Sequence, residues 1–261
     1  LIASYNNAEH SEEAIQLFEM MSDEHAKPNE VTFVAIINAC SLVGNLELSM
    51  QIHFKLVSYG KEIDSLVGNA LIDSYVKCGD IHCACFVFDK MTHKDIISWN
   101  SIISGYALHG YARKSLLLGE GMQQAYIEPN DVTFLGVLSA CSRVGLIDEG
   151  VYIFISMVQD GHIILTDDHF VCMVDLLARI GHLYDAADLI RSLPLDINSV
   201  VSRALLNGCK LHGEFELAIS VIKNMIDSEQ DDASAFALML NMFASCTSFG
   251  VEEVMRFFEQ E

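Results

Sequence analysis

Six glycines recur along this chain at nearly constant intervals, and this period constrains the fold more than any other feature of the sequence. They are Gly44, Gly79, Gly110, Gly145, Gly181 and Gly213, separated by 35, 31, 35, 36 and 32 residues. Self-similarity at a period of 20–50 residues is typical of proteins built from stacked supersecondary units. The sequence therefore predicts a repeat architecture and not a single globular core.

A longer repeat of about 101 residues contains these units. The segment Val31-Thr32-Phe33 returns as Val132-Thr133-Phe134, and Pro28-Asn29 returns as Pro129-Asn130, each 101 residues later. The glycine intervals divide this longer repeat into units of about 35, 31 and 35 residues. The unit lengths therefore alternate, which is unusual among repeat families.

Within each unit the apolar side chains follow helical spacing. They recur every three residues before Gly44 and every four after it: Val31, Val34, Ile37 and Cys40, then Leu46, Met50 and Phe54. Glycine is the residue expected after the C-terminus of a helix, and a second helix begins just beyond it. Each unit is thus expected to be a helix–turn–helix. The chain is expected to be an all-α, right-handed α-superhelix, or solenoid, of stacked repeats.

Composition excludes several classes of protein. No apolar stretch reaches the 18 or more residues of a membrane span, so no membrane contact is expected. Cys40, Cys141 and Cys209 recur in phase with the repeat and are interpreted as small buried hydrophobes. The remaining cysteines complete no zinc motif, so neither a metal nor another cofactor is expected. Fifteen Lys and Arg against 36 Asp and Glu give a net charge of −21, which repels polyphosphate at long range.

Local motifs then identify a family. The segment from Ile97-Ser98-Trp99-Asn100 to Gly105-Tyr106, followed by Pro129-Asn130, resembles the pentatricopeptide repeat. The alternating unit lengths are similar to its plant PLS subclass, in which P, L and S units follow one another, and the resemblance extends to the C-terminal E region of that subclass. The implied boundaries are 1–29 (partial P), 30–64 (L), 65–95 (S), 96–130 (P), 131–166 (L) and 167–198 (S), with a truncated E region over 199–261.

The resemblance also implies where a ligand binds. In this family one RNA base is read per unit by the fifth side chain and the last one, which matches the logic of repeats that read one base each. The implied RNA-binding residues are Asn69 with Asp95, Asn100 with Asn130, and Asn29 in the partial unit; the first pair implies uracil and the second a pyrimidine. Weaker candidates are Val34 with Asp64, Leu135 with Thr166, and Val171 with Asn198, because an apolar fifth side chain cannot hydrogen-bond a base edge.

Two alternatives stay open for these residues. Asn69 and Asn100 could instead be N-cap asparagines at the start of a helix. Trp99, the only tryptophan, is interpreted as packing between units in preference to stacking on a base.

The chain is not expected to be an enzyme. Some relatives end in a zinc-dependent cytidine deaminase, which needs His-x-Glu and Pro-Cys-x-x-Cys, and none of the three prolines here precedes a cysteine. The resemblance implies binding of single-stranded organellar RNA in a mitochondrion or chloroplast. It further implies site recognition for cytidine-to-uridine editing, with a deaminase or accessory protein docking on the E region. The chain begins within a repeat, so no transit peptide is expected in it. A tetratricopeptide-like protein-binding scaffold is the competing hypothesis, favoured by the acidic charge.

Overall fold

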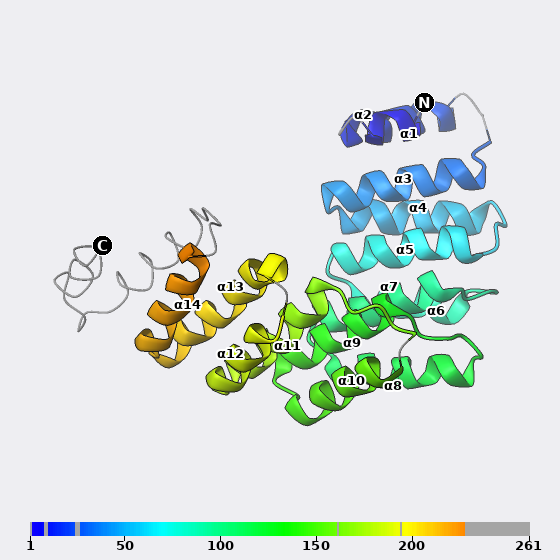
Figure 1. Ribbon diagram of the computed structural model, residues 1–261. Helices are drawn as coiled ribbons and strands as arrows, with labels where there is room; N and C mark the ends of the chain where they lie inside the picture. The colour runs from blue at the N-terminus through cyan, green and yellow to red at the C-terminus, as the bar shows by residue number, and fades with distance from the viewer. Residues whose placement is uncertain (1, 8–9, 24–26, 161, 194, 228–261) are drawn as a thin grey trace. The chain divides into compact units, whose positions relative to one another are not determined.

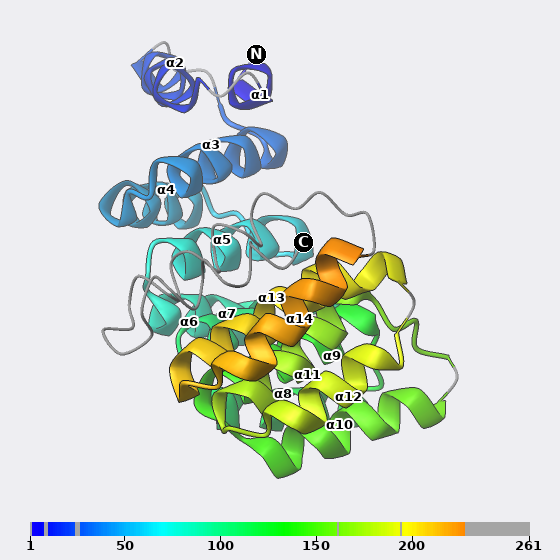
Figure 2. The same ribbon diagram turned by 60° about the vertical axis from the view of Figure 1, so that its left-hand side comes forward.

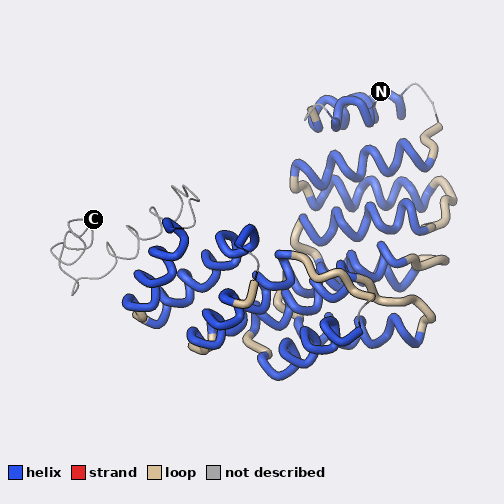
Figure 3. The backbone as a smooth tube through the Cα atoms, in the orientation of Figure 1, coloured by secondary structure: helices blue, strands red, loops and turns tan. Residues whose placement is uncertain are grey.

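The computed structural model describes residues 2–7, 10–23, 27–160, 162–193 and 195–227. These residues form fourteen α-helices, and no strand occurs among them (Figure 3). The all-α class that the glycine period predicted is confirmed. The chain divides into two compact units, residues 1–144 and 145–261.

The first unit holds nine helices joined by short turns (Figure 1). Their bounds are α1 Ile2–Asn7, α2 Ser11–Asp23, α3 Glu30–Val43, α4 Leu46–Ser58, α5 Ser65–Lys77, α6 Ile81–Lys90, α7 Ile96–Leu108, α8 Ala112–Gln124 and α9 Asp131–Val144. The odd-numbered helices pack on one another in sequence, from α1 to α3, α5, α7 and α9. Each even-numbered helix packs against the odd helix before it and the one after it, so the unit has two layers, as Figures 1 and 2 both show.

The second unit continues the same alternation of helices. Their bounds are α10 Ile147–Asp160, α11 Asp167–Arg179, α12 Leu183–Arg191, α13 Leu195–His212 and α14 Phe215–Asp227. Helix α11 packs on α13, and α12 contacts both, which repeats the pattern of the first unit. Helices α13 and α14 form the last hairpin of the described residues.

The periodic glycines end the first helix of each hairpin, as the sequence predicts. Gly44 has a φ of 70°, and its N–H donates to the carbonyls of Cys40 and Ser41 at the end of α3. The other five periodic glycines also have positive φ, between 73° and 89°. A left-handed residue at this place satisfies the last carbonyls of a helix and turns the chain, which strongly favours glycine.

The buried face of the α3–α4 hairpin differs in part from the apolar face that the spacing of its residues predicts. Val31 is 64% exposed and Phe54 is 76% exposed, and Met50 is also exposed. Ile37 and Cys40, which the spacing also included, are fully buried as expected. The other side chains in the core of the α3–α4 hairpin lie one or two positions from the predicted ones: Phe33 and Ile36 in α3, with Ile52 and Leu56 in α4. Helices with apolar residues on more than one side do not reveal from spacing alone which side is buried.

Other core assignments from the sequence are confirmed. Cys40, Cys141 and Cys209 are fully buried. Trp99 is 9% exposed and packs edge-on against Phe88, with ring centroids 5.1 Å apart, so it is a packing residue.

The C-terminal boundary is where the sequence was least informative. The expected end of the last S unit at residue 198 lies inside α13, which begins at Leu195. The expected E region over 199–261 begins inside α13, and its residues 228–261 lie outside the described residues.

Candidate functional site

Asn69 and Asp95 are joined by a hydrogen bond, although 26 residues separate them. The side-chain amide of Asn69, on the second turn of α5, donates from Nδ2 to Oδ1 of Asp95 over 3.2 Å. Asp95 is the N-cap of α7, and the same Oδ1 accepts the backbone N–H of Ser98 at 2.9 Å. The Ser98 hydroxyl lies 2.6 Å from Oδ1 of Asn69 and closes the triangle. One polar network therefore joins the fifth and last residues of unit 65–95 to the third residue of the next unit.

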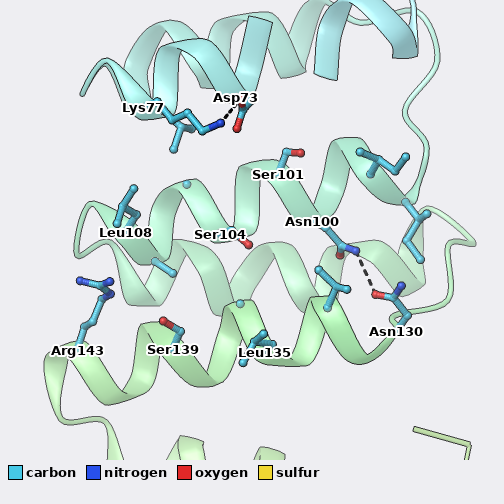
Figure 4. Close-up of a pocket in the computed structure, with 17 residues that line it drawn as sticks. Asp73, Lys77, Asn100, Ser101, Ser104, Leu108, Asn130, Leu135, Ser139 and Arg143 are labelled. Carbon is cyan, nitrogen blue, oxygen red and sulfur yellow. Dashed lines mark hydrogen bonds and ion pairs between the residues drawn. The ribbon is translucent and has the colours of Figure 1, made fainter. Parts of the chain in front are cut away.

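The next unit repeats this network with different residues. Asn100 donates from Nδ2 to Oδ1 of Asn130 over 3.1 Å, the bond marked in Figure 4. Oδ1 of Asn130 also accepts the backbone N–H of Thr133 at 3.1 Å, one turn into α9. The Thr133 hydroxyl lies 2.6 Å from Oδ1 of Asn100. Asn100 is 9% exposed, and Thr133 is buried.

The donors and acceptors fix the orientation of both amides. A carboxylate such as Asp95 only accepts, so Asn69 must turn its NH₂ group toward it and its oxygen toward Ser98. Oδ1 of Asn130 is identified as the oxygen because a backbone N–H donates to it, so Asn100 must also present NH₂ there. The amides of Asn69 and Asn100 each keep one N–H and one oxygen lone pair outside this network.

Asn69 and Asn100 are not N-caps, which settles the alternative left open by the sequence. Each is the fifth residue of its helix, while the caps of α5 and α7 are Asp64 and Asp95. The capping role falls instead on the last residue of each unit. Asp64, Asp95 and Asn130 thus have a structural function before any ligand is considered.

Hydrogen bonding keeps Asp95 ionised. Burial alone would raise the pKa of this carboxyl, but hydrogen bonds from Ser98 and Asn69 outweigh it and lower the pKa below 3.8. At neutral pH the residue is therefore an acceptor only.

A groove of about 680 Å³ runs along the first helices α5, α7 and α9 of the hairpins. Asn100 and Asn130 line it, and so does Leu135, the fifth residue of the following unit (Figure 4). The same helices contribute small polar residues, Ser101, Ser104 and Ser139. Equivalent positions of consecutive units thus share one surface, as expected for stacked repeats.

Exposed apolar side chains recur three positions before the fifth residue of consecutive units, and the sequence analysis did not single them out as a row. The second residue of four consecutive units is large, apolar and mostly exposed: Val31 (64%), Leu66 (52%), Ile97 (58%) and Val132 (47%). Ile97 and Val132 line the groove. The sequence carries this signal as an apolar residue three positions before each of these fifth residues, but only Val31 was assigned a place, and that place was the buried face.

Charge in the groove differs from charge in the chain. The charged side chains that line it are Asp73, Lys77 and Arg143, with a net charge of +1, against −21 for the whole sequence. Lys77 pairs with Asp73 over 2.8 Å. Arg143 forms no ion pair with any residue that the structure describes. The acidity of the sequence therefore lies mostly outside the groove.

The other expected site residues lack the full network. Asn29 is the N-cap of α3 and bonds Thr32, and Asp64 is the N-cap of α5, but no hydrogen bond joins Asp64 to the apolar Val34. Leu135 and Thr166 belong to different compact units, and Thr166 bonds His169 at the start of α11. Val171 lies half-buried in α11, and Asn198 lies inside α13 and not at a helix start.

The described residues contain neither a metal-binding cluster nor a membrane-spanning helix. No three His, Cys, Asp or Glu side chains there gather in a way that could hold a metal ion. No helix in that part of the chain is long and apolar enough to cross a membrane.

Family models match most of this chain. A model described as pentatricopeptide repeat domain matches residues 1–45. A second model, the PPR repeat, matches residues 31–60, 69–96, 97–127, 132–162 and 200–229.

Curated proteins of Arabidopsis thaliana are similar over nearly the whole chain. The chloroplastic pentatricopeptide repeat-containing protein ELI1 is 37% identical over 251 residues, which are 95% of this chain and 40% of that protein. A mitochondrial pentatricopeptide repeat-containing protein is 38% identical over 247 residues, 94% of this chain and 36% of its own length. The chain spans about two fifths or less of the length of these relatives.

Solved structures support the fold. The pentatricopeptide repeat protein PPR10 in complex with an 18-nucleotide psaJ RNA element superposes with a TM-score of 0.81 at 16% identity, covering 100% of this chain and 39% of that one. PPR10 from maize superposes with a TM-score of 0.60 at 18% identity, covering 99% and 38%. At these identities the likeness concerns the fold alone. With the period, the helical hairpins and the family models in agreement, this chain belongs to the pentatricopeptide repeat family.

Proposed function

We propose that this chain binds single-stranded RNA in a sequence-specific manner, with Asn69/Asp95 and Asn100/Asn130 each reading one base. The observation that carries the proposal is the repeated network. Two consecutive units hold a fifth-position asparagine in the same orientation, through the same three bonds. Each amide retains a donor and an acceptor, which are the groups needed to bond the Watson–Crick edge of an unstacked base.

The last residue of each unit makes the two sites chemically different. Asp95 only accepts, so it suits uracil, whose N3–H is a donor at the centre of the base edge. Nδ2 of Asn130 joins none of the hydrogen bonds between described residues, so it offers a donor that also suits N3 of cytosine, an acceptor. The proposed preferences are therefore uracil at the first site and a pyrimidine at the second.

The exposed apolar row supports the same proposal. Ile97 belongs to the Asn100 unit and Val132 to the unit that follows it, and both line the groove. Aliphatic side chains that contact both faces of an unpaired base remove apolar surface from water, and this favours binding of the base. Single-stranded RNA presents such bases, whereas a duplex does not.

We further propose the cellular role that the family resemblance implies. The chain would act in a mitochondrion or chloroplast, the compartments named for the two plant relatives. It would recognise sites for cytidine-to-uridine editing without itself being the catalyst. The E region, of which α13 and α14 form the described part, would recruit the deaminase or an accessory protein.

A protein-binding scaffold of tetratricopeptide type is the second candidate, and one observation favours it. The chain carries a net charge of −21, and residues 145–261 contribute 19 Asp and Glu against six Lys and Arg. A surface this acidic repels RNA at long range. The balanced groove of the first unit is the reason to prefer RNA.

A binding titration tests the proposal. Fluorescently labelled 12-nucleotide RNAs would contain either a central uracil–cytosine step or only adenines, and the chain would be titrated at fixed, low salt. We expect tighter binding to the pyrimidine RNA, and Asn100→Ala should reduce that difference by about 1–3 kcal/mol, the usual value of a base-reading contact. Asn38→Ala is the matched control, since Asn38 is an exposed asparagine on α3, which is the first helix of its hairpin. Equal binding to both RNAs would favour the scaffold.

A further inference from the structure

The unit that follows each of the two asparagine units carries a hydroxyl at its third residue. Ser98 follows Asn69, and Thr133 follows Asn100, each 2.6 Å from the amide oxygen. Where the fifth residue is Val34, the third residue of the next unit is Val67, which is apolar and fully buried. Hydroxyl and asparagine therefore occur together in both of these pairs of units.

The Thr133 hydroxyl has both a donor that it accepts from and an acceptor that it donates to. Oγ1 of Thr133 accepts the backbone N–H of Asn130 at 3.1 Å, so its own hydrogen is directed to a different partner. The nearest acceptor is Oδ1 of Asn100 at 2.6 Å, against 3.1 Å to Oδ1 of Asn130. Ser98 has the same arrangement, accepting from the backbone of Asp95 at 3.2 Å.

We infer that Ser98 and Thr133 are specificity-determining positioning residues, because each holds the reading amide of the preceding unit in one orientation. Both hydroxyls are buried, so neither would contact RNA directly. Without the hydroxyl, the amide oxygen would lose its one strong donor, and only the acceptor oxygen of the last residue would still orient the amide. A base site that reads by donor and acceptor order would then discriminate less well between bases. This inference rests on the proposed RNA function.

Replacement of Thr133 by valine tests the inference at one site. Valine keeps the shape of threonine in a buried position and removes only the hydroxyl. We expect Thr133→Val to lower the preference for pyrimidine over purine RNA about tenfold, equivalent to 1.4 kcal/mol, while Thr133→Ser retains it. Thermal unfolding of both variants establishes that they are folded.

Thr32→Val is the matched control. Thr32 holds the same third position in its unit, and its hydroxyl bonds Oδ1 of Asn29 at 2.8 Å but no fifth-position asparagine among the described residues. It should reduce stability by a similar amount and leave the base preference unchanged. If Thr133→Val and Thr32→Val have the same effect on base preference, the hydroxyl acts only through the helix cap, and the inference is wrong.

A second measurement separates this inference from the RNA proposal. In the RNA-free protein, NMR relaxation of the Asn100 side-chain NH₂ group reports how firmly the amide is held. Thr133→Val should lower its order parameter and leave that of Asn69 unchanged. If the wild-type chain fails to bind RNA, the proposed function fails, yet this order parameter still decides the positioning role. An unchanged order parameter would overturn the inference even if RNA binds.

Discussion

Asp95 and Asn130 hold the same place in consecutive units, yet they present opposite groups to a ligand. Each caps the next helix with Oδ1, and each accepts the amide of an asparagine 26 or 30 residues earlier. Apart from these shared hydrogen bonds, Asp95 can only accept hydrogen bonds, whereas Asn130 also has an NH₂ group that can donate them. The difference between the two sites is thus one functional group on an otherwise common framework.

Exchanging that group should exchange the base preference. Asp95→Asn keeps a capping oxygen but adds a donor, so we expect the first site to shift from uracil toward cytosine by about 1–3 kcal/mol. Competition between uracil- and cytosine-containing RNAs measures the shift. Asp64→Asn is the control, because Asp64 caps α5 in the same way but faces an apolar fifth residue. A comparable shift in the control would show that the effect is not base reading.

Arg143 should contribute to affinity without contributing to specificity. It lines the groove and has no carboxylate partner in the described part of the chain, so it can contact a phosphate. We expect Arg143→Gln to weaken binding to all RNAs alike and to reduce the slope of log affinity against log salt by about 0.7, the value for one phosphate contact on a single strand. Arg113→Gln, in the second helix α8, should leave the slope unchanged. Loss of base preference in Arg143→Gln would contradict this role.

Two helical glycines should respond to alanine with opposite signs. A Cβ on Gly208 of α13 would lie 2.4 Å from Cβ and 3.1 Å from Cα of Ala178 in α11, so the two helices would have to separate. Overpacking of this kind costs about 1–3 kcal/mol of unfolding free energy. A Cβ on Gly121 would meet nothing closer than 3.6 Å, and Gly121→Ala should stabilise α8 by up to about 1 kcal/mol. Denaturant unfolding of both variants measures the two effects, and a stabilising Gly208→Ala would refute the close approach.

His53 should make stability fall between neutral and mildly acidic pH. Burial lowers its pKa below the ordinary 6.5, and its Nδ1 lies 2.9 Å from the Tyr75 hydroxyl. The unfolded chain therefore binds a proton at a higher pH than the folded chain, so acidification from 6.5 down to the folded pKa favours unfolding. His53→Phe should remove this part of the pH dependence of the unfolding midpoint. An identical slope in the variant between pH 7 and 5 would show that His53 does not titrate on unfolding.

The repeat period was sufficient to predict most of the fold, because each glycine marks a helix end through its own backbone conformation. Gly44 and Gly181 need no tertiary information to be recognised, and both are left-handed. The buried face was harder. Val31 and Phe54 fit a helical apolar pattern as well as Phe33 does, and only the packing of neighbouring helices determines which of them is buried.

The site was predictable in part for a similar reason. Asn69, Asp95, Asn100 and Asn130 were identified by their place in the repeat, and the structure brings each pair into hydrogen-bonding contact. The hydroxyls of Ser98 and Thr133 escaped notice because their partners lie in another unit, 29 and 33 residues earlier. Asn198 was assigned to a unit end, but the helix start that would mark that end comes earlier, at Leu195.

The last residue of each unit caps the next helix, and this role limits which side chains can occupy the position that sets the proposed base preference. Asp64, Asp95 and Asn130 each accept the N–H of the third residue in the following helix, so only side chains with a short acceptor preserve that helix start. Asp, Asn, Ser and Thr meet this demand, and they differ in charge, donor count and reach. Under the proposed function, a longer or apolar side chain would change the base preference and also weaken the hairpin. Exchanges among these four residues would change the proposed preference at little cost in stability, whereas any other residue would affect both.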